Sequence, residues 1–478
     1  MRLLFFLALA VPLFAQTPCA DMARLPNVTA AIQTTSYCRV SITLRPAADS
    51  EIKSEVWLPT TSVWNGKLLM EGGGGLVGSI NTEGMTHAVR EGYASASTDT
   101  GHSGSGGRFA LGHTDKITDF AYRAVHETAV KAKALIAAYY GRGPRVSYWE
   151  GCSTGGRQGL MSAQRYPEDF DGIIAGAPAY NQIYISAWRM RLLMTALKSP
   201  QHALLAEKLK LINDAVLDKC DSNDGVKDRL IEDPRNCNFD PSAFKCNGTE
   251  TTSCLTSQQL ETVNTAYTDM RKSTGELLYP RLPFGGELGW RLPADATASG
   301  AMDIDIFRYI ANQDPAWNWR SFDLEKDIDR ALLHGKEIHA INPDLVKFKA
   351  RGGKLLMYHG WSDGGSDGSI SALNTVSYYE SVLKLMGPNQ DDWFRLFMVP
   401  GMDHCGGGTG PNQFNKLGAL ERWREQNQPP KSITAARVNE SGVIDMTRPL
   451  CPYPQQAVYK GSGSTNDAAN FTCKVKGN

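Results

Sequence analysis

The 478-residue sequence has no excess charge of either sign, because 50 Lys and Arg residues balance 50 Asp and Glu residues. It also has no run of basic residues, so the composition gives no electrostatic reason to bind nucleic acid or an anionic membrane surface. No internal repeat or low-complexity segment is visible. With 42% hydrophobic and 21% charged residues, the chain is instead typical of a globular protein with a large core, in one domain with an insertion or in several domains.

Long apolar runs are missing beyond the N-terminus. There, residues 3–14 form a short apolar segment that follows Arg2 and ends at Ala15. It is shorter than the roughly 20 residues that a membrane-spanning helix needs, and its order of basic, apolar and small residues is typical of a secretory signal peptide. A buried N-terminal helix is the alternative. We expect residues 1–15 to be removed and the protein to be secreted or periplasmic, with no membrane partner.

The ten cysteines contain no CxxC pair, which disfavours a zinc ribbon or a thioredoxin-type site. In an oxidising compartment their even number is typical of disulfides. Short separations predict four local bridges, namely Cys19–Cys38, Cys220–Cys237, Cys246–Cys254 and Cys451–Cys473. Cys152 and Cys405, far apart in the sequence, are left for the fifth.

Strand-like and helical segments alternate on both sides of a central stretch with a different pattern. This alternation predicts an α/β fold with a mostly parallel sheet and helices on both faces. Between the two parts, helical segments mix with paired cysteines, prolines and tryptophans, and we expect an inserted second domain at residues 181–350. The core then comprises residues 16–180 and 351–478, the latter ending in a coil-rich wrap.

The motif with the clearest chemistry is Gly151-Cys152-Ser153-Thr154-Gly155-Gly156. It follows a predicted strand at 146–150 and precedes a helical segment at 157–164, which is the setting of a G-x-S-x-G nucleophile elbow. We expect the Ser153 hydroxyl to be the nucleophile and the Thr154 amide to be one oxyanion donor. The second donor is expected from the glycine loop at 72–75, which follows another predicted strand.

A base and its acid partner are expected just past the last strands of such a core, in the order Ser, Asp, His. His404 lies in a glycine-rich loop after the predicted strand at 394–399, and Asp363 follows the strand at 354–358. Asp367 competes with Asp363, whereas Asp403 is too local to orient its neighbour. A Cys152–Cys405 bridge would join the nucleophile and base loops directly, because bridged Cα atoms lie within about 7 Å.

These motifs resemble the Cys-Ser/Asp/His-Cys signature of the tannase and feruloyl esterase family, which also includes a bacterial mono(2-hydroxyethyl) terephthalate hydrolase. The likeness extends through Tyr166–Ile173 and Arg448–Pro454 and covers almost the whole mature chain. It implies an α/β-hydrolase core, a lid domain and esters of aromatic acids as substrates, and it favours Gly75 as the second oxyanion donor. The segment 364–369 is longer than the family's usual one.

An acidic loop in the lid carries Asp221, Asp224 and Asp228 within eight residues, around Gly225. Hard oxygen ligands near a glycine turn suit Ca²⁺, although the spacing is not that of an EF-hand; a solvated acidic turn is the alternative. The resemblance implies a structural Ca²⁺ held by these three side chains. It also implies carbonyl ligands from a further pair of residues, Val226 and Leu230.

Together these features predict a secreted serine carboxylesterase that works through an acyl-enzyme. The expected substrate is a small aromatic ester derived from plant cell walls or polyphenols, with a hydroxycinnamoyl group such as feruloyl preferred. Galloyl esters and terephthalate monoesters are the alternatives within this class. A non-catalytic binding protein on the same fold is the alternative from another class, disfavoured because Ser153 and His404 are both present.

Overall fold

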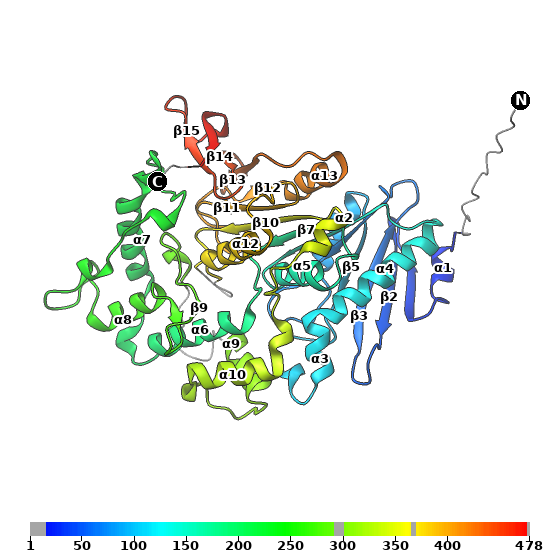
Figure 1. Cartoon of the computed structure of the whole chain (residues 1–478), viewed down its shortest axis with the longest axis horizontal. Helices are drawn as coiled ribbons and strands as arrows, with labels where there is room; N and C mark the ends of the chain where they lie inside the picture. Colours follow the sequence, from blue (N-terminus) through cyan, green and yellow to red (C-terminus); the bar gives the residue numbers. More distant parts are fainter. Residues whose placement is uncertain (1–15, 291–300, 365–369, 476–478) are drawn as a thin grey trace, which may run out of the picture.

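The computed structural model describes residues 16–290, 301–364 and 370–475, so the predicted signal peptide and Asp367 lie outside the described part. A nine-stranded sheet in the order β1-β2-β3-β5-β4-β6-β7-β10-β11 forms its centre (Figure 1). Its strands are β1 (Val28–Gln33), β2 (Tyr37–Leu44), β3 (Ile52–Pro59), β4 (Lys67–Glu71), β5 (Ala94–Thr98), β6 (Val146–Cys152), β7 (Gly172–Gly176), β10 (Lys354–Gly360) and β11 (Phe394–Val399).

The sheet is antiparallel at its N-terminal edge, from β1 to β5, and parallel from β5 through β4, β6, β7 and β10 to β11. The predicted mostly parallel sheet is therefore present. Because the parallel strands run the same way, the carboxyl ends of β4, β6, β7, β10 and β11 lie at one edge, where α/β folds place their ligands.

Helices cover both faces of the sheet, and alternate residues of its strands supply the contacts. In β10, Leu355 and Met357 belong to one buried apolar cluster, whereas Leu356 and Tyr358 belong to another. The helices that flank the sheet are α2 (Thr82–Arg90), α4 (Ala124–Tyr140), α5 (Thr154–Arg165), α12 (Ala372–Met386) and α13 (Lys416–Gln426), with the short α1 (Cys19–Met22) and α3 (Thr114–Thr118) nearby. Burial on both faces explains why the central strands carry few polar residues.

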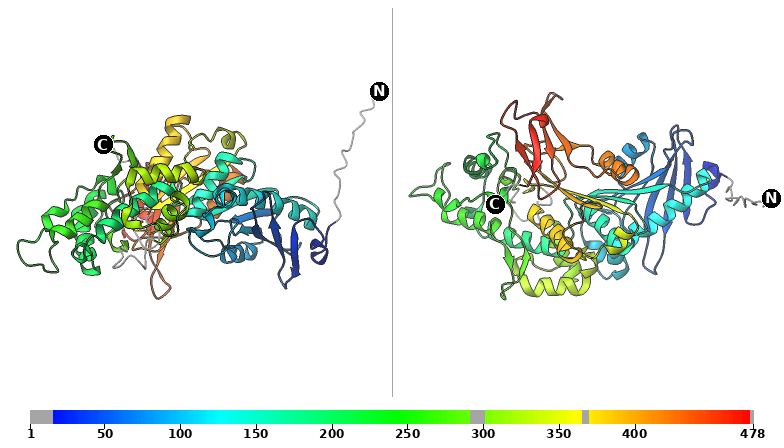
Figure 2. Two further views of the ribbon diagram at one scale, coloured as in Figure 1. Left: turned by 90° about the horizontal axis from the view of Figure 1, so that it is seen from below. Right: turned by 45° about the horizontal axis from the view of Figure 1, so that its top comes forward.

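The segment between β7 and β10 is mainly helical. Its Trp188, Val263 and Phe307 belong to an apolar cluster that also takes in Leu76 and Phe120 from the first part of the chain. Its elements are α6 (Gln182–Ala196), α7 (Ala206–Cys220), α8 (Ser257–Ala266), β8 (Met270–Arg271), β9 (Leu277–Tyr279), α9 (Ala301–Asp305), α10 (Leu324–Gly335) and α11 (Val346–Ala350). They lie beside the end of the sheet opposite β1 (Figure 2). Phe348 of α11, inside the predicted insertion, packs into the core cluster instead.

The last 50 residues are more ordered than the predicted coil-rich wrap. There, β13 (Ile433–Val438) and β14 (Ile444–Leu450) form a three-stranded antiparallel sheet with β12 (Gln413–Phe414), which lies just before this segment. A hairpin of β15 (Gln456–Tyr459) and β16 (Phe471–Lys474) follows. The coil prediction was wrong because these strands are short and their pairing partners lie elsewhere in the segment, which a local pattern does not reveal.

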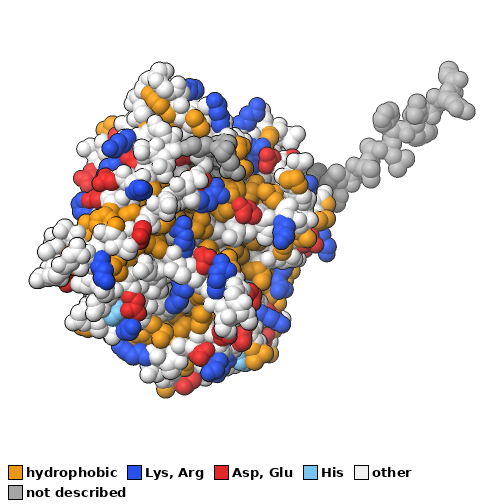
Figure 3. Space-filling model, turned by 60° about the vertical axis from the view of Figure 1, so that its left-hand side comes forward, with side chains coloured by type: hydrophobic (Ala, Val, Ile, Leu, Met, Phe, Trp, Pro, Cys, Tyr) orange, Lys and Arg blue, Asp and Glu red, His pale blue; other side chains and the backbone are white. Residues whose placement is uncertain are grey.

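All five predicted disulfides are present in the structure: Cys19–Cys38, Cys152–Cys405, Cys220–Cys237, Cys246–Cys254 and Cys451–Cys473. In the described residues no helix has both the length and the apolarity to cross a bilayer. Acidic and basic side chains are interspersed on the face drawn in Figure 3, in agreement with the zero net charge.

Candidate active site

Ser153 occupies a sharp turn between β6 and α5, at the carboxyl edge of the sheet. Its backbone has φ +61° and ψ −120°, a conformation that non-glycine residues rarely adopt. The turn depends on glycine: a Cβ on Gly151 would lie 2.6 Å from the Gly155 carbonyl, and one on Gly156 would lie 2.4 Å from the Gly176 oxygen. The Ser153 amide donates to that same Gly176 oxygen at 2.9 Å, which ties the turn to β7.

His404 and Asp363 meet at the ends of two neighbouring strands. Asp363 follows β10, His404 lies in the loop after β11, and the imidazole Nδ1 donates to Asp363 Oδ2 at 2.6 Å. A carboxylate only accepts hydrogen bonds, so the contact fixes the proton on Nδ1 and makes Nε2 the basic nitrogen of His404. His404 and Ser153 line the same cavity.

Asp363 is fully buried, and two histidines hold its charge. Burial by itself raises the pKa of the Asp363 carboxyl, but His404 and His359 outweigh burial and lower the pKa to about 2. The carboxyl is therefore ionised at neutral pH, the state that an acceptor for the imidazole needs.

His359 is a second histidine in contact with Asp363. It is fully buried in β10 and does not line the Ser153 cavity. Its Nε2 donates to Asp363 Oδ2 at 2.9 Å, and its Nδ1 lies 2.7 Å from the hydroxyl of Thr375. The spacing of four residues between His359 and Asp363 was visible in the sequence, but only the turn after β10 brings the two side chains together.

The Cys152–Cys405 disulfide connects the residue before Ser153 to the residue after His404. Its Cα atoms are 5.9 Å apart, and both cysteines line the cavity beside the two proposed catalytic side chains. Cys405 has φ +64°, so the loop that carries His404 turns sharply at the bridge. The covalent link limits how far the Ser153 and His404 loops can separate.

The glycine loop after β4 packs against the start of α5. A Cβ on Gly72 would lie 2.7 Å from the Gly155 Cα, and the Thr154 hydroxyl donates to the Gly75 carbonyl at 2.9 Å. The Thr154 amide belongs to the first turn of α5, whose amides have no acceptor within the helix. Gly75 and Thr154 border the Ser153 cavity from two sides, the placement expected of two oxyanion donors.

The cavity in front of Ser153 has a volume of about 650 Å³ and a mainly apolar lining. Asp403, next to His404 in the sequence, borders a separate cavity beside Trp361. Trp290 of the inserted segment packs on Tyr267 at a ring distance of 5.0 Å.

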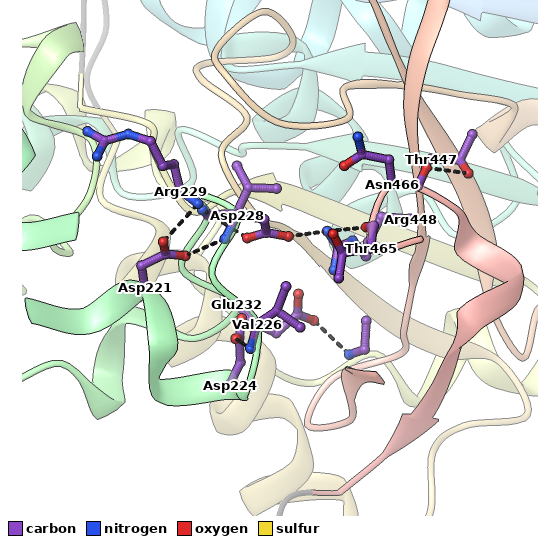
Figure 4. Close-up of polar contacts among 12 residues, drawn as sticks. Asp221, Asp224, Val226, Asp228, Arg229, Glu232, Thr447, Arg448, Thr465 and Asn466 are labelled. Carbon is purple, nitrogen blue, oxygen red and sulfur yellow. Dashed lines mark hydrogen bonds and ion pairs between the residues drawn. The ribbon is translucent and has the colours of Figure 1, made fainter. Parts of the chain in front are cut away.

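The predicted calcium loop follows α7 and is drawn in Figure 4. Asp221 accepts hydrogen bonds from the amides of Asp228 and Arg229 at 3.2 and 2.9 Å. Asp224 accepts from the Val226 amide at 2.8 Å. Asp228 accepts from the Leu230 amide at 3.2 Å and pairs with Arg448 of β14.

The chemistry of this loop suits a hard cation better than its geometry does. Burial, together with the charges of Asp228 and Asp221, raises the pKa of Asp224 to about 6, and burial also raises the pKa of Glu232 to about 8. A cation would relieve that repulsion. Within the described ranges, however, no three acidic, histidine or cysteine side chains are arranged to hold a metal, so calcium binding stays a prediction.

Comparison with known proteins gives the family. The family model described as tannase and feruloyl esterase matches residues 38–474. Feruloyl esterase B of Aspergillus niger is 33% identical over 458 residues, which cover 91% of this chain and 86% of that protein. A solved feruloyl esterase B from Aspergillus oryzae superposes with a TM-score of 0.85 at 33% identity, covering 93% of this chain and 91% of that one.

A second solved structure, an esterase from Aspergillus oryzae, has a TM-score of 0.87 at 31% identity and covers 95% of this chain and 99% of its own. The sheet order and the elbow agree with the fold these likenesses indicate. The protein therefore belongs to the tannase and feruloyl esterase family and is a carboxylic ester hydrolase with an α/β-hydrolase fold.

Proposed function

We propose that this protein hydrolyses esters of aromatic acids, feruloyl esters first, with Ser153, His404 and Asp363 as the catalytic triad. The observation that carries the proposal is the 2.6 Å contact between His404 and the buried, ionised Asp363, on an imidazole that shares one cavity with Ser153. The names of the feruloyl esterase B relatives support the choice of acyl group.

In the proposed reaction, His404 Nε2 takes the proton of the Ser153 hydroxyl as its oxygen attacks the ester carbonyl. The amides of Thr154 and Gly75 stabilise the oxyanion, and Asp363 stabilises the imidazolium. His404 then protonates the leaving alcohol, and an acyl group remains on Ser153. Water, activated by the same imidazole, releases the aromatic acid and restores the enzyme.

Methyl ferulate, methyl gallate and a terephthalate monoester test this function. We expect the wild type to hydrolyse methyl ferulate best and Ser153→Ala to lose all activity while it keeps the wild-type melting temperature. Activity that survives in Ser153→Ala would remove the nucleophile assignment. Inactivity of a folded wild type on every ester would favour the alternative of a non-catalytic binding protein.

We further propose that residues 1–15 direct export and that a structural Ca²⁺ occupies the loop after α7. Five disulfides support an oxidising compartment, because such bridges persist outside the reducing cytosol. Asp221, Asp224 and Asp228, with the carbonyls of Val226 and Leu230, would hold the ion. Its role would be to neutralise a buried acidic cluster at the base of the lid.

A further inference from the structure

The far part of the Ser153 cavity is lined by one face of α6. Gln182, Ile185 and Arg189 are spaced at i, i+3 and i+7, so they follow one another along the same side of the helix. The segment that leads into α6 contacts the turn at Ser153, because the Ala179 amide donates to the Ser153 carbonyl at 3.0 Å. Seven residues of α-helix advance about 10 Å, so Arg189 lies about 10 Å further along α6 than Gln182.

Helix α9 closes the same cavity from the lid. Its Met302 sulfur lies 3.5 Å from the position that a Cβ on Gly75 would take, so the helix passes over the glycine loop. Asp305 is one turn further along α9 and also borders the cavity. Its Oδ2 accepts a hydrogen bond from the Gly107 amide at 2.8 Å, which fixes the carboxylate in place.

Helix α9 takes part in two arginine–aspartate contacts, one with α6 and one with the turn that follows α9. Arg189 Nε lies 3.2 Å from Asp303 Oδ2, and Arg308 Nη1 lies 3.5 Å from Asp305 Oδ1. Asp303 is buried, and the Nη1 of Arg189 has no hydrogen-bond partner in the described part of the chain. Of these four side chains, Arg189 and Asp305 line the cavity, so its polar lining carries one formal charge of each sign.

We propose that Arg189 and Asp305 recognise a ring hydroxyl of the aromatic acid and so act as specificity determinants of the proposed esterase reaction, on which this inference rests. A phenolic hydroxyl both accepts and donates, so it matches a guanidinium and a carboxylate at once. A methoxy group only accepts. A carboxylate also only accepts, so a terephthalate monoester has no donor for Asp305.

The position of the pair also selects the length of the acyl group. A hydroxycinnamoyl ester carries a vinyl spacer between the ester carbon and the ring, whereas a galloyl ester does not. The ring hydroxyl of the longer group therefore reaches further from Ser153, toward the part of α6 that carries Arg189. Ile185 and Met302 offer apolar contact to the spacer and ring on the way.

The test compares methyl 4-hydroxycinnamate, methyl 4-methoxycinnamate and methyl cinnamate, which differ only at the ring position in question. In the wild type we expect kcat/KM to be about 10- to 100-fold higher for the hydroxyl ester than for either of the others, as for hydrogen bonds to charged groups. Equal values for the three esters would overturn the inference while leaving the proposed function intact. Hydrolysis of none of them by folded protein would overturn the proposed function and the inference with it.

Variants then locate the preference. Asp305→Asn, and the double variant Arg189→Gln/Asp303→Asn that leaves no unpaired buried charge, should each reduce the ratio of hydroxyl to unsubstituted ester about tenfold. Arg191→Gln is the matched control, because its guanidinium lies on the same helix but donates to the carbonyls of Thr265 and Asp269. It should keep the wild-type ratio. A wild-type ratio in both test variants would contradict the assignment.

Discussion

His359 and His404 donate hydrogen bonds to the same oxygen, Oδ2 of Asp363, at 2.9 and 2.6 Å. One imidazole is fully buried and the other borders the substrate cavity. The buried imidazole of His359 therefore helps to hold the Asp363 carboxylate in place. That carboxylate in turn orients the imidazole of His404.

Asp363→Asn should lower kcat by about 10⁴-fold, because an amide in place of the carboxylate stabilises the wrong tautomer of His404. Steady-state kinetics with methyl ferulate measures the loss. Asp403→Asn, next to the histidine but bordering another cavity, is the control and should lose little. A comparable loss in both variants would argue against Asp363 as the acid.

His359→Gln should lower kcat about tenfold with KM nearly unchanged, because the residue positions Asp363 and does not line the substrate cavity. His339→Gln serves as the control, since His339 is another buried histidine, bonded to the Ile183 amide at 3.2 Å. Both variants are expected to lose thermal stability. A kcat loss of the same size in both would mean that His359 is only structural.

Removal of the long-range disulfide by Cys152→Ala/Cys405→Ala should reduce both activity and stability. The bridge closes a sequence separation of 253 residues, for which chain entropy alone predicts about 5.5 kcal/mol. The control Cys246→Ala/Cys254→Ala opens a separation of 8 residues, worth about 2.5 kcal/mol, and should keep the wild-type kcat. Urea unfolding and kinetics on the two variants separate the effects.

Glu71 makes the stability of the core depend on pH. Burial and the charge of Glu150, its neighbour across β4 and β6, raise the pKa of Glu71 to about 8, although Lys416 opposes the shift. Because the pKa of Glu71 is raised in the folded state, its contribution to the free energy of unfolding is complete at pH values below the ordinary pKa of glutamate. This contribution is lost as the pH rises toward 8.

We therefore expect Glu71→Gln to be less sensitive than the wild type to alkaline pH, because its amide stays neutral. Thermal melts from about pH 5 to about pH 9 measure the difference between the two proteins. Glu83→Gln, an exposed glutamate in the first turn of α2, is the control and should follow the wild type. Parallel curves for Glu71→Gln and the wild type would contradict the expected shift.

Treatment with EDTA should lower the melting temperature by several degrees and leave kcat unchanged at temperatures where the protein is folded, because a bound ion adds its binding free energy to the folded state. Added Ca²⁺ should restore the melting temperature. Asp224→Asn should melt at a lower temperature that EDTA does not change further. A melting temperature insensitive to EDTA would remove the calcium proposal.

The sequence alone was enough for the features that depend on local pattern and chain order. The glycine-flanked turn at Ser153, the strand ends before Asp363 and His404, and the four short disulfides follow from residues close together in the chain. The Cys152–Cys405 bridge followed by elimination, and the structure confirms it.

Only the tertiary structure decided which distant side chains share an environment. It brought His359 into contact with Asp363 and placed Arg189 and Asp305 in the lining of the Ser153 cavity. It also paired the first three strands antiparallel and built strands from the C-terminal segment. The physical reason is that hydrogen bonds, burial and charge act over a few ångströms in space, between residues that the linear order separates by up to hundreds of positions.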